Sequence, residues 1–154
     1  MPDSRPVHAP PLLTSLQGPW RRVVFVTLYE LIAIAAATLG FMLFTGHGAA
    51  NSGVISVICS VVAVAWNVLF NAAFELWESR QRRRGRSVWR RVAHAAGFES
   101  GLALLLVPLL AWWFDVGLWQ ALVMDLGLLL FFLAYTFVFN WGFDRVFGLP
   151  AAAA

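Results

Sequence analysis

The sequence predicts an all-α integral membrane protein, in which four transmembrane helices form two helical hairpins that are parallel repeats of each other. Three observations support this fold class. Of the 154 residues, 60% are hydrophobic and only 12% are charged, whereas soluble domains carry about 25% charged residues. The hydrophobic residues fall into four long runs. The pattern of the first two runs recurs in the last two.

Each apolar run is long enough to cross a membrane. A transmembrane helix needs about 20 consecutive apolar residues, and lipid admits only helices or closed barrels. Runs this long and continuous indicate helices rather than barrel strands. The predicted spans are Val23–Phe44, Gly53–Phe74, Val92–Phe114 and Leu118–Phe143.

Polar and glycine-rich segments separate the spans and define the organisation of the chain. We expect turns within residues 40–53 and 114–117, and a kink at Pro108 in the third span. The proline-rich start of the chain is typical of disorder. The expected segments are a disordered cytoplasmic tail over residues 1–20, a first transmembrane hairpin over 21–79, a basic cytoplasmic loop over 80–90, a second transmembrane hairpin over 91–146 and a C-terminal tail over 147–154.

The arginine residues predict the orientation in the membrane. All 11 basic residues are arginines, and they lie beside the two termini or around the central loop. Because cytoplasmic loops carry an excess of positive charge, we expect both termini and the central loop in the cytoplasm of a bacterium, with the protein in its inner (cytoplasmic) membrane. Contact with the anionic lipid bilayer already explains a basic loop, so no nucleic-acid partner is expected.

An internal repeat relates the two hairpins at one constant offset. In the first part of each hairpin the offset is 99 − 30 = 69, and in the second part it is 140 − 71 = 69. Because each copy holds two spans, both copies enter the membrane from the same side, as parallel repeats do. The residues Arg22, Tyr29, Glu30, Trp66, Phe70, Asn71, Phe74 and Glu75 align with Arg91, Phe98, Glu99, Tyr135, Phe139, Asn140, Phe143 and Asp144.

The carboxyl groups within the spans are the strongest functional candidates, because an ionisable residue in lipid is costly and rarely incidental. Glu30 lies 30 − 22 = 8 residues past Arg22, which is about 12 Å along a helix. A carboxyl group that holds either a proton or a cation is the simplest basis for antiport. The alternative is a neutral Glu30 that only bonds a neighbouring helix.

Two further acids in the spans leave similar alternatives open. Glu99 matches Glu30, but it could instead pair with His94 or Arg91. Asp125 aligns with Ser56, since 125 − 56 = 69, and it falls near the outer end of the fourth span. It could be a cation or proton site on the exit side, or an interfacial residue in water. We therefore group Glu30, Glu99 and Asp125 as candidates for proton coupling and substrate binding.

Polar and aromatic residues form neighbouring ridges on the second span, and the fourth span repeats this arrangement. Amides and rings together suit a cation-binding cavity, but buried amides also join helices in membranes. Glu75 and Asp144 fall at cytoplasmic ends, where they could cap helices or pair with arginines. The ridges contain Trp66, Asn67, Phe70, Asn71 and Phe74 in the second span, and Tyr135, Thr136 and Asn140 in the fourth.

These residues also carry a family resemblance. The segment from Arg91 to Glu99 resembles the RxxHxxxFE motif of the proteobacterial antimicrobial compound efflux family, also called the bacterial transmembrane pair family. The segments 66–75 and 135–144 resemble its WNxxxNxxFD/E motif and the matching motif of the fourth helix. The resemblance covers about residues 21–145. In the first motif, Phe25 stands where the family usually has histidine.

The resemblance implies a proton-coupled exporter of cationic, often amphipathic compounds, such as chlorhexidine, acriflavine and quaternary ammonium biocides, or natively short diamines. It implies that the glutamate matching Glu30, next to Tyr29, takes part in proton coupling and substrate binding. Four short helices enclose little volume, so we expect a homodimer, with weak support from the small residues Gly97 and Gly101.

Two other classes of function fit the sequence less well than an exporter does. A non-transporting membrane scaffold or assembly factor is the leading alternative, but it would not need Glu30 at membrane depth. An enzyme is not expected, because no nucleophile–base pair or metal-ligand spacing is present, and Cys59 is the single cysteine. We expect no cofactor.

Overall fold

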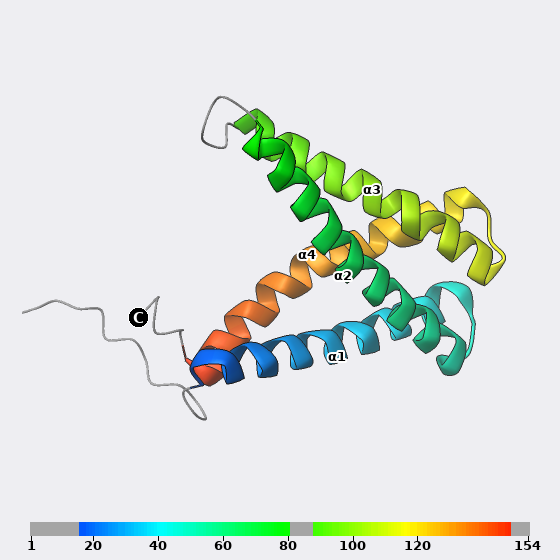
Figure 1. Cartoon of the computed structure of the whole chain (residues 1–154). Helices are drawn as coiled ribbons and strands as arrows, with labels where there is room; N and C mark the ends of the chain where they lie inside the picture. Colours follow the sequence, from blue (N-terminus) through cyan, green and yellow to red (C-terminus); the bar gives the residue numbers. More distant parts are fainter. Residues whose placement is uncertain (1–15, 81–87, 149–154) are drawn as a thin grey trace, which may run out of the picture. The chain divides into compact units, whose positions relative to one another are not determined.

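Four long helices make up the computed structural model, which describes residues 16–80 and 88–148. They are α1 (Gly18–Thr45), α2 (Ala49–Ser79), α3 (Val88–Phe114) and α4 (Leu118–Phe147) (Figure 1). All four are long and apolar enough to cross a membrane, which confirms the predicted fold class. Most of the predicted tails and of the basic loop lies outside the described residues.

The turn between α1 and α2 is shorter than the sequence predicts. Helix α1 continues through Gly40 and ends at Thr45, and α2 already includes Gly53, so the turn expected within residues 40–53 narrows to three residues. Gly46 ends α1 with a φ of 72°, a left-handed conformation that glycine adopts without steric cost. The second turn lies where the sequence predicts it, between Phe114 and Leu118.

The chain packs as two compact units, and the second unit, residues 34–129, contains the main buried cluster. Every helix contributes to this cluster: Phe41 from α1, Ile55 from α2, Leu110 from α3 and Met124 from α4. Figure 1 shows the four helix segments of this unit meeting near the two short turns.

Most buried positions of the second unit follow the 69-residue repeat. Because these side chains are buried at matched positions in both hairpins, the duplication shapes the packing as well as the sequence. The matched buried pairs are Ala37 and Leu106, Phe41 and Leu110, Ser52 and Ala121, Ile55 and Met124, and Ser56 and Asp125.

The first unit joins the first half of α1 to the last half of α4. These segments, blue and orange-red in Figure 1, lie side by side. The backbone N–H of Leu16 donates to the carbonyl of Phe147 at 3.2 Å. Aromatic side chains of the two segments contact one another, including Phe25 with Phe139 and Tyr29 with Tyr135.

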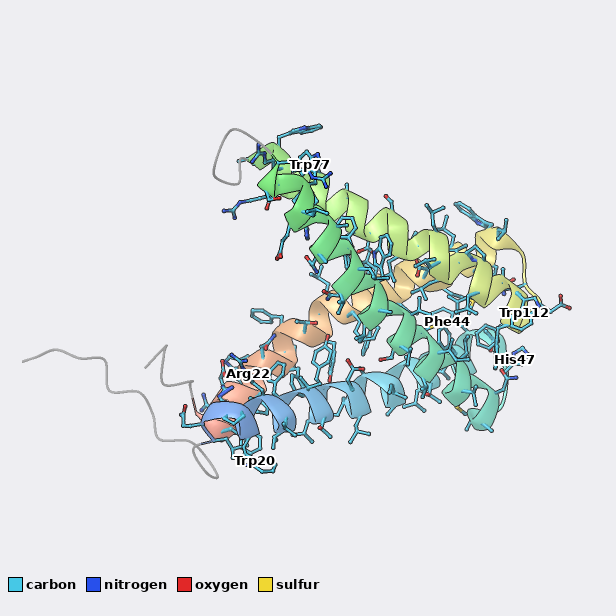
Figure 2. All side chains as sticks on the ribbon, in the orientation of Figure 1. Trp20, Arg22, Phe44, His47, Trp77 and Trp112 are labelled. Carbon is cyan, nitrogen blue, oxygen red and sulfur yellow. The ribbon has the colours of Figure 1, made fainter. Side chains whose placement is uncertain are left out.

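Large apolar side chains also cover the outward surfaces of the helices, as lipid requires and water would not permit. Leu43 is 86% exposed and Trp112 is 75% exposed. Figure 2 shows Phe44 and Trp112 close to the turns that join the helices. Aromatic residues at such ends suit the membrane–water interface.

Candidate functional site

Glu30 is half-buried on α1 in the first unit, beside a hydrogen-bonded pair of tyrosines. The Tyr135 hydroxyl donates to the Tyr29 carbonyl at 2.9 Å, and the Tyr29 hydroxyl lies 2.8 Å from the Thr136 hydroxyl. The Glu30 carboxylate interacts electrostatically with Tyr135. The peptide that carries Glu30 is therefore fixed to α4 by hydrogen bonds.

A cluster of aromatic rings accompanies Glu30 in this unit. The Tyr29 ring lies 4.9 Å from that of Tyr135 and 5.3 Å from that of Phe139. The Phe25 ring meets Phe139 and Phe143 edge-on, at 5.2 and 5.0 Å. Aromatic faces attract organic cations, most strongly where water is excluded. A carboxylate beside such rings has the composition of a cation-binding site.

The same helix-to-helix bond occurs between α2 and α3 in the second unit. The Trp66 Nε1–H donates to the Phe98 carbonyl at 2.9 Å, and the Phe70 and Phe98 rings lie 5.6 Å apart. These positions match Tyr135, Tyr29 and Phe139 at the offset of 69. In both repeats, an aromatic side chain therefore donates a hydrogen bond to the backbone carbonyl of the residue that precedes the glutamate. Glu99 is half-buried, like Glu30.

One of the matched positions at which the repeats differ holds His94 in the second repeat and Phe25 in the first. The ring arrangement is conserved: His94 meets Phe70 and Phe74 edge-on at 5.1 and 4.6 Å, as Phe25 meets its two rings. The His94 Nε2, however, also lies 3.0 Å from the Asn71 Oδ1, a bond that phenylalanine cannot make.

Asn71 extends this bond into a polar chain along α2. Its Nδ2 donates to the carbonyl of Asn67 at 2.8 Å and to the Asn67 Oδ1 at 2.6 Å. With the amide in this orientation, the Asn71 Oδ1 accepts and the His94 Nε2 carries the hydrogen. Asn140, the counterpart of Asn71, donates to the Thr136 carbonyl of its own helix. Asn71 thus joins two helices in this structure.

Of the charged residues predicted at the helix ends, Asp144 forms an ion pair, whereas Arg22, Arg91 and Glu75 are exposed. Asp144 accepts from Arg21 at 2.5 Å, and Arg21 also donates to the Gly148 carbonyl at 2.9 Å. Arg22, the neighbour singled out in the repeat, is exposed on the first turns of α1 (Figure 2). Arg91 and Glu75 are exposed as well. The sequence does contain a signal that could have identified Arg21, because Arg21 has its own repeat counterpart in Arg90, at 90 − 21 = 69.

Asp125 is buried on α4, with 7% of its surface exposed. It belongs to the second unit, where Glu99 on α3 and Cys59 on α2 interact with it electrostatically. The structure thus places Asp125 in the protein interior, and Glu99 among its electrostatic neighbours. Glu30 belongs to the other unit.

A family model described as chlorhexidine efflux transporter matches the chain twice, over residues 17–80 and 86–149. The chain belongs to the chlorhexidine efflux transporter family. The two matches are displaced by 86 − 17 = 69 residues, so each hairpin of the repeat corresponds to one copy of the family unit. As a member of this family, the protein is a membrane transporter and not an enzyme.

Three curated relatives of this transporter are each named "Short-chain diamines transporter". The relative from Acinetobacter baylyi is 35% identical over 82% of this chain and 89% of its own length. Those from Vibrio parahaemolyticus and Acinetobacter baumannii are 34% and 32% identical, over 81% and 82% of this chain and 89% and 87% of theirs. No solved structure matches the transporter.

Proposed function

We propose that this transporter is a proton-coupled exporter of cationic compounds, in which Glu30 binds the substrate and the coupling proton alternately. The single observation that carries the proposal is the half-buried Glu30 carboxyl group beside the aromatic cluster of the first unit. The family description names chlorhexidine, and the relatives' names contain diamines. Both are cations at neutral pH, so one carboxylate site suits either.

The exchange follows from the charge of one carboxyl group. Ionised Glu30 attracts a cation, and the rings of Tyr29, Tyr135 and Phe139 add cation–π contact. A proton from outside neutralises Glu30, so the attraction vanishes and the cation leaves. Because a protonated carboxyl group and a carboxylate paired with one cationic group of the substrate are each locally neutral, both suit a low-dielectric site. Mutually exclusive occupancy then makes proton entry and cation export one cycle.

The remaining predicted residues take supporting roles in this proposal. Trp66, Asn67, Phe70 and Asn71 on α2 form the matching wall in the second unit, and Glu99 on α3 occupies the position of Glu30 there. We propose a homodimer in the bacterial inner membrane with cytoplasmic termini, because four helices enclose little volume and the arginines favour that orientation. Amphipathic biocides are favoured over short diamines at the aromatic face of the first unit, since they bring apolar surface as well as charge.

Glu30→Gln tests the proposal, with Glu75→Gln as its matched control. Glutamine keeps the size and hydrogen bonding of glutamate but cannot ionise, and Glu75 is an exposed acid near the end of α2. Export of chlorhexidine or acriflavine should fail for E30Q and persist for E75Q in an efflux-deficient host. Binding in detergent should weaken as pH falls for the wild type and E75Q, but not for E30Q. Full export by E30Q at normal expression would eliminate Glu30 as the coupling site.

A further inference from the structure

We infer that Asp125 forms a second proton-binding site, distinct from Glu30, whose protonation holds the core of the second unit closed. The inference rests on the proposed proton coupling and extends it, because it adds a site that senses the proton through helix packing. The carboxyl group comes from α4, and the groups around it come from α2 and α3.

The burial of Asp125 is the first observation. Its side chain is 7% exposed, and its neighbour Met124 and the preceding turn's Ala121 belong to the buried apolar cluster. In the described part of the chain, no arginine pairs with Asp125; its electrostatic neighbours are the Glu99 carboxyl group and the Cys59 thiol. A buried carboxylate without a counter-charge is strongly disfavoured, so this closed core suits a neutral carboxyl group.

An unsatisfied hydroxyl group in the same core is the second, independent observation. Ser52 on α2 is 0% exposed, and its Oγ has no hydrogen-bond partner among the residues that the structure describes. Ser56 lies one turn further on the same face, is 2% exposed, and donates to the Ser52 carbonyl at 2.7 Å. Buried polar atoms are nearly always bonded. Ser56 is also the repeat counterpart of Asp125, so both hairpins direct a polar group into this core.

Loss of the proton would change what the core can accommodate. An ionised Asp125 would add a negative charge near Glu99, inside an apolar cluster. The core would then have to admit water or a cation, and the contact of α4 with α2 and α3 would loosen. The titratable groups that face Asp125 are Glu99 on α3 and Cys59 on α2; the part of α1 in this unit, residues 34–45, has none. Proton binding and core closure would therefore be linked.

Cys59 provides a direct measurement of this opening. It is the only cysteine of the chain, it is 8% exposed, and it lies in the same cluster. Its labelling rate with a membrane-permeant maleimide reports how often the core opens. Because the thiol's own ionisation also depends on pH, the wild-type rate is divided at each pH by the rate for Asp125→Asn, which mimics the protonated form permanently.

The expected ratio is about 1 at low pH and rises with pH by up to about tenfold per unit, the limit for one linked proton. Glu30→Gln should keep this rise although it abolishes export, because Glu30 lies in the other unit. A ratio that stays at 1 across the pH range would overturn the inference. A rise that disappears in E30Q would assign the linked proton to Glu30 and also overturn it.

A double variant keeps the inference testable if D125N does not fold. Ser56→Asp combined with Asp125→Ser moves the carboxyl group to the matched buried position of the first repeat. For this variant the labelling ratio relative to the carboxyl-free variant Asp125→Ser should rise with pH, as the ratio of wild type to D125N does. If export fails in every variant and the wild type, but the ratio of labelling rates still rises with pH, the proposed function is refuted and the Asp125 site stands.

Discussion

Gly101→Ala should destabilise the transporter, because Gly101 provides the space that the Trp66 ring fills. A Cβ atom at Gly101 would lie 2.1 Å from the Trp66 Cζ2 and 2.7 Å from its Cη2, far below van der Waals contact. The ring cannot turn away cheaply, since its Nε1–H donates to the Phe98 carbonyl and its centroid lies 5.4 Å from that of the Phe70 ring.

The magnitude follows from the contacts that the methyl group would break. Displacing Trp66 loses one hydrogen bond, worth about 1 kcal/mol, and aromatic contact worth about 0.5–1.5 kcal/mol. The gain from replacing glycine with alanine inside a helix, about 1 kcal/mol, offsets part of this. Strain in the neighbouring side chains adds about 1–3 kcal/mol. We expect a net loss of about 2–4 kcal/mol in the free energy of unfolding.

Thermal unfolding in detergent, followed by circular dichroism, measures the effect. Gly127→Ala is the matched control, because a Cβ atom there meets nothing within 4 Å; it should leave the midpoint unchanged or raise it. Trp66→Phe should relieve the clash, so adding G101A should cost much less in that background than in the wild type. If G101A unfolds at the same temperature as G127A, Gly101 does not make room for Trp66 and this packing is wrong.

Two further predictions concern orientation and the polar chain. A periplasm-active reporter, such as alkaline phosphatase, fused after Ala154 should give no signal, because the arginines favour cytoplasmic termini; a strong signal from a well-expressed fusion would reverse the orientation. His94→Phe, which copies the matched Phe25, should keep the ring packing but lose the bond to Asn71, lowering the thermal midpoint by an amount equivalent to about 1 kcal/mol. The control Asn140→Ala removes an amide that bonds only within its own helix, and an equal effect of the two variants would contradict the role of His94.

The fold was predictable from the sequence because its determinants are local. Several contacts of the candidate site were not predictable from the sequence. Apolar runs fix the number of spans in lipid, and the 69-residue offset fixes their relation. The helix ends were less certain: Gly40 lies inside α1, since a membrane helix satisfies its own backbone and tolerates glycine. Sequence could not decide between Arg21 and Arg22 as the partner of Asp144, because that choice depends on the rotation of α1 against α4.

Gly97 and Gly101 illustrate most clearly what the sequence alone could not predict. Small residues four apart favour close approach of helices, but the pattern does not say which helix approaches. In the structure, the Phe70 ring lies near Gly97 and the Trp66 ring near Gly101, both from the same chain. The spacing of these glycines therefore does not support a homodimer. The proposal of a dimer rests on the small volume that four helices enclose.

The differences between the repeats give the two units different side-chain chemistry, because a duplicated fold alone would give two equivalent halves. At one matched pair the first repeat has an apolar ring, Phe25, and the second has the imidazole of His94. At another, Ser56 is a hydroxyl group and Asp125 an acid. The first unit thus combines a glutamate with an aromatic wall, which suits an organic cation. The second unit combines acids with a sealed core, which suits a proton. Each unit contains segments of both hairpins, so divergence of the two copies gives the units different environments, and the proposed exchange of a cation for a proton would use both.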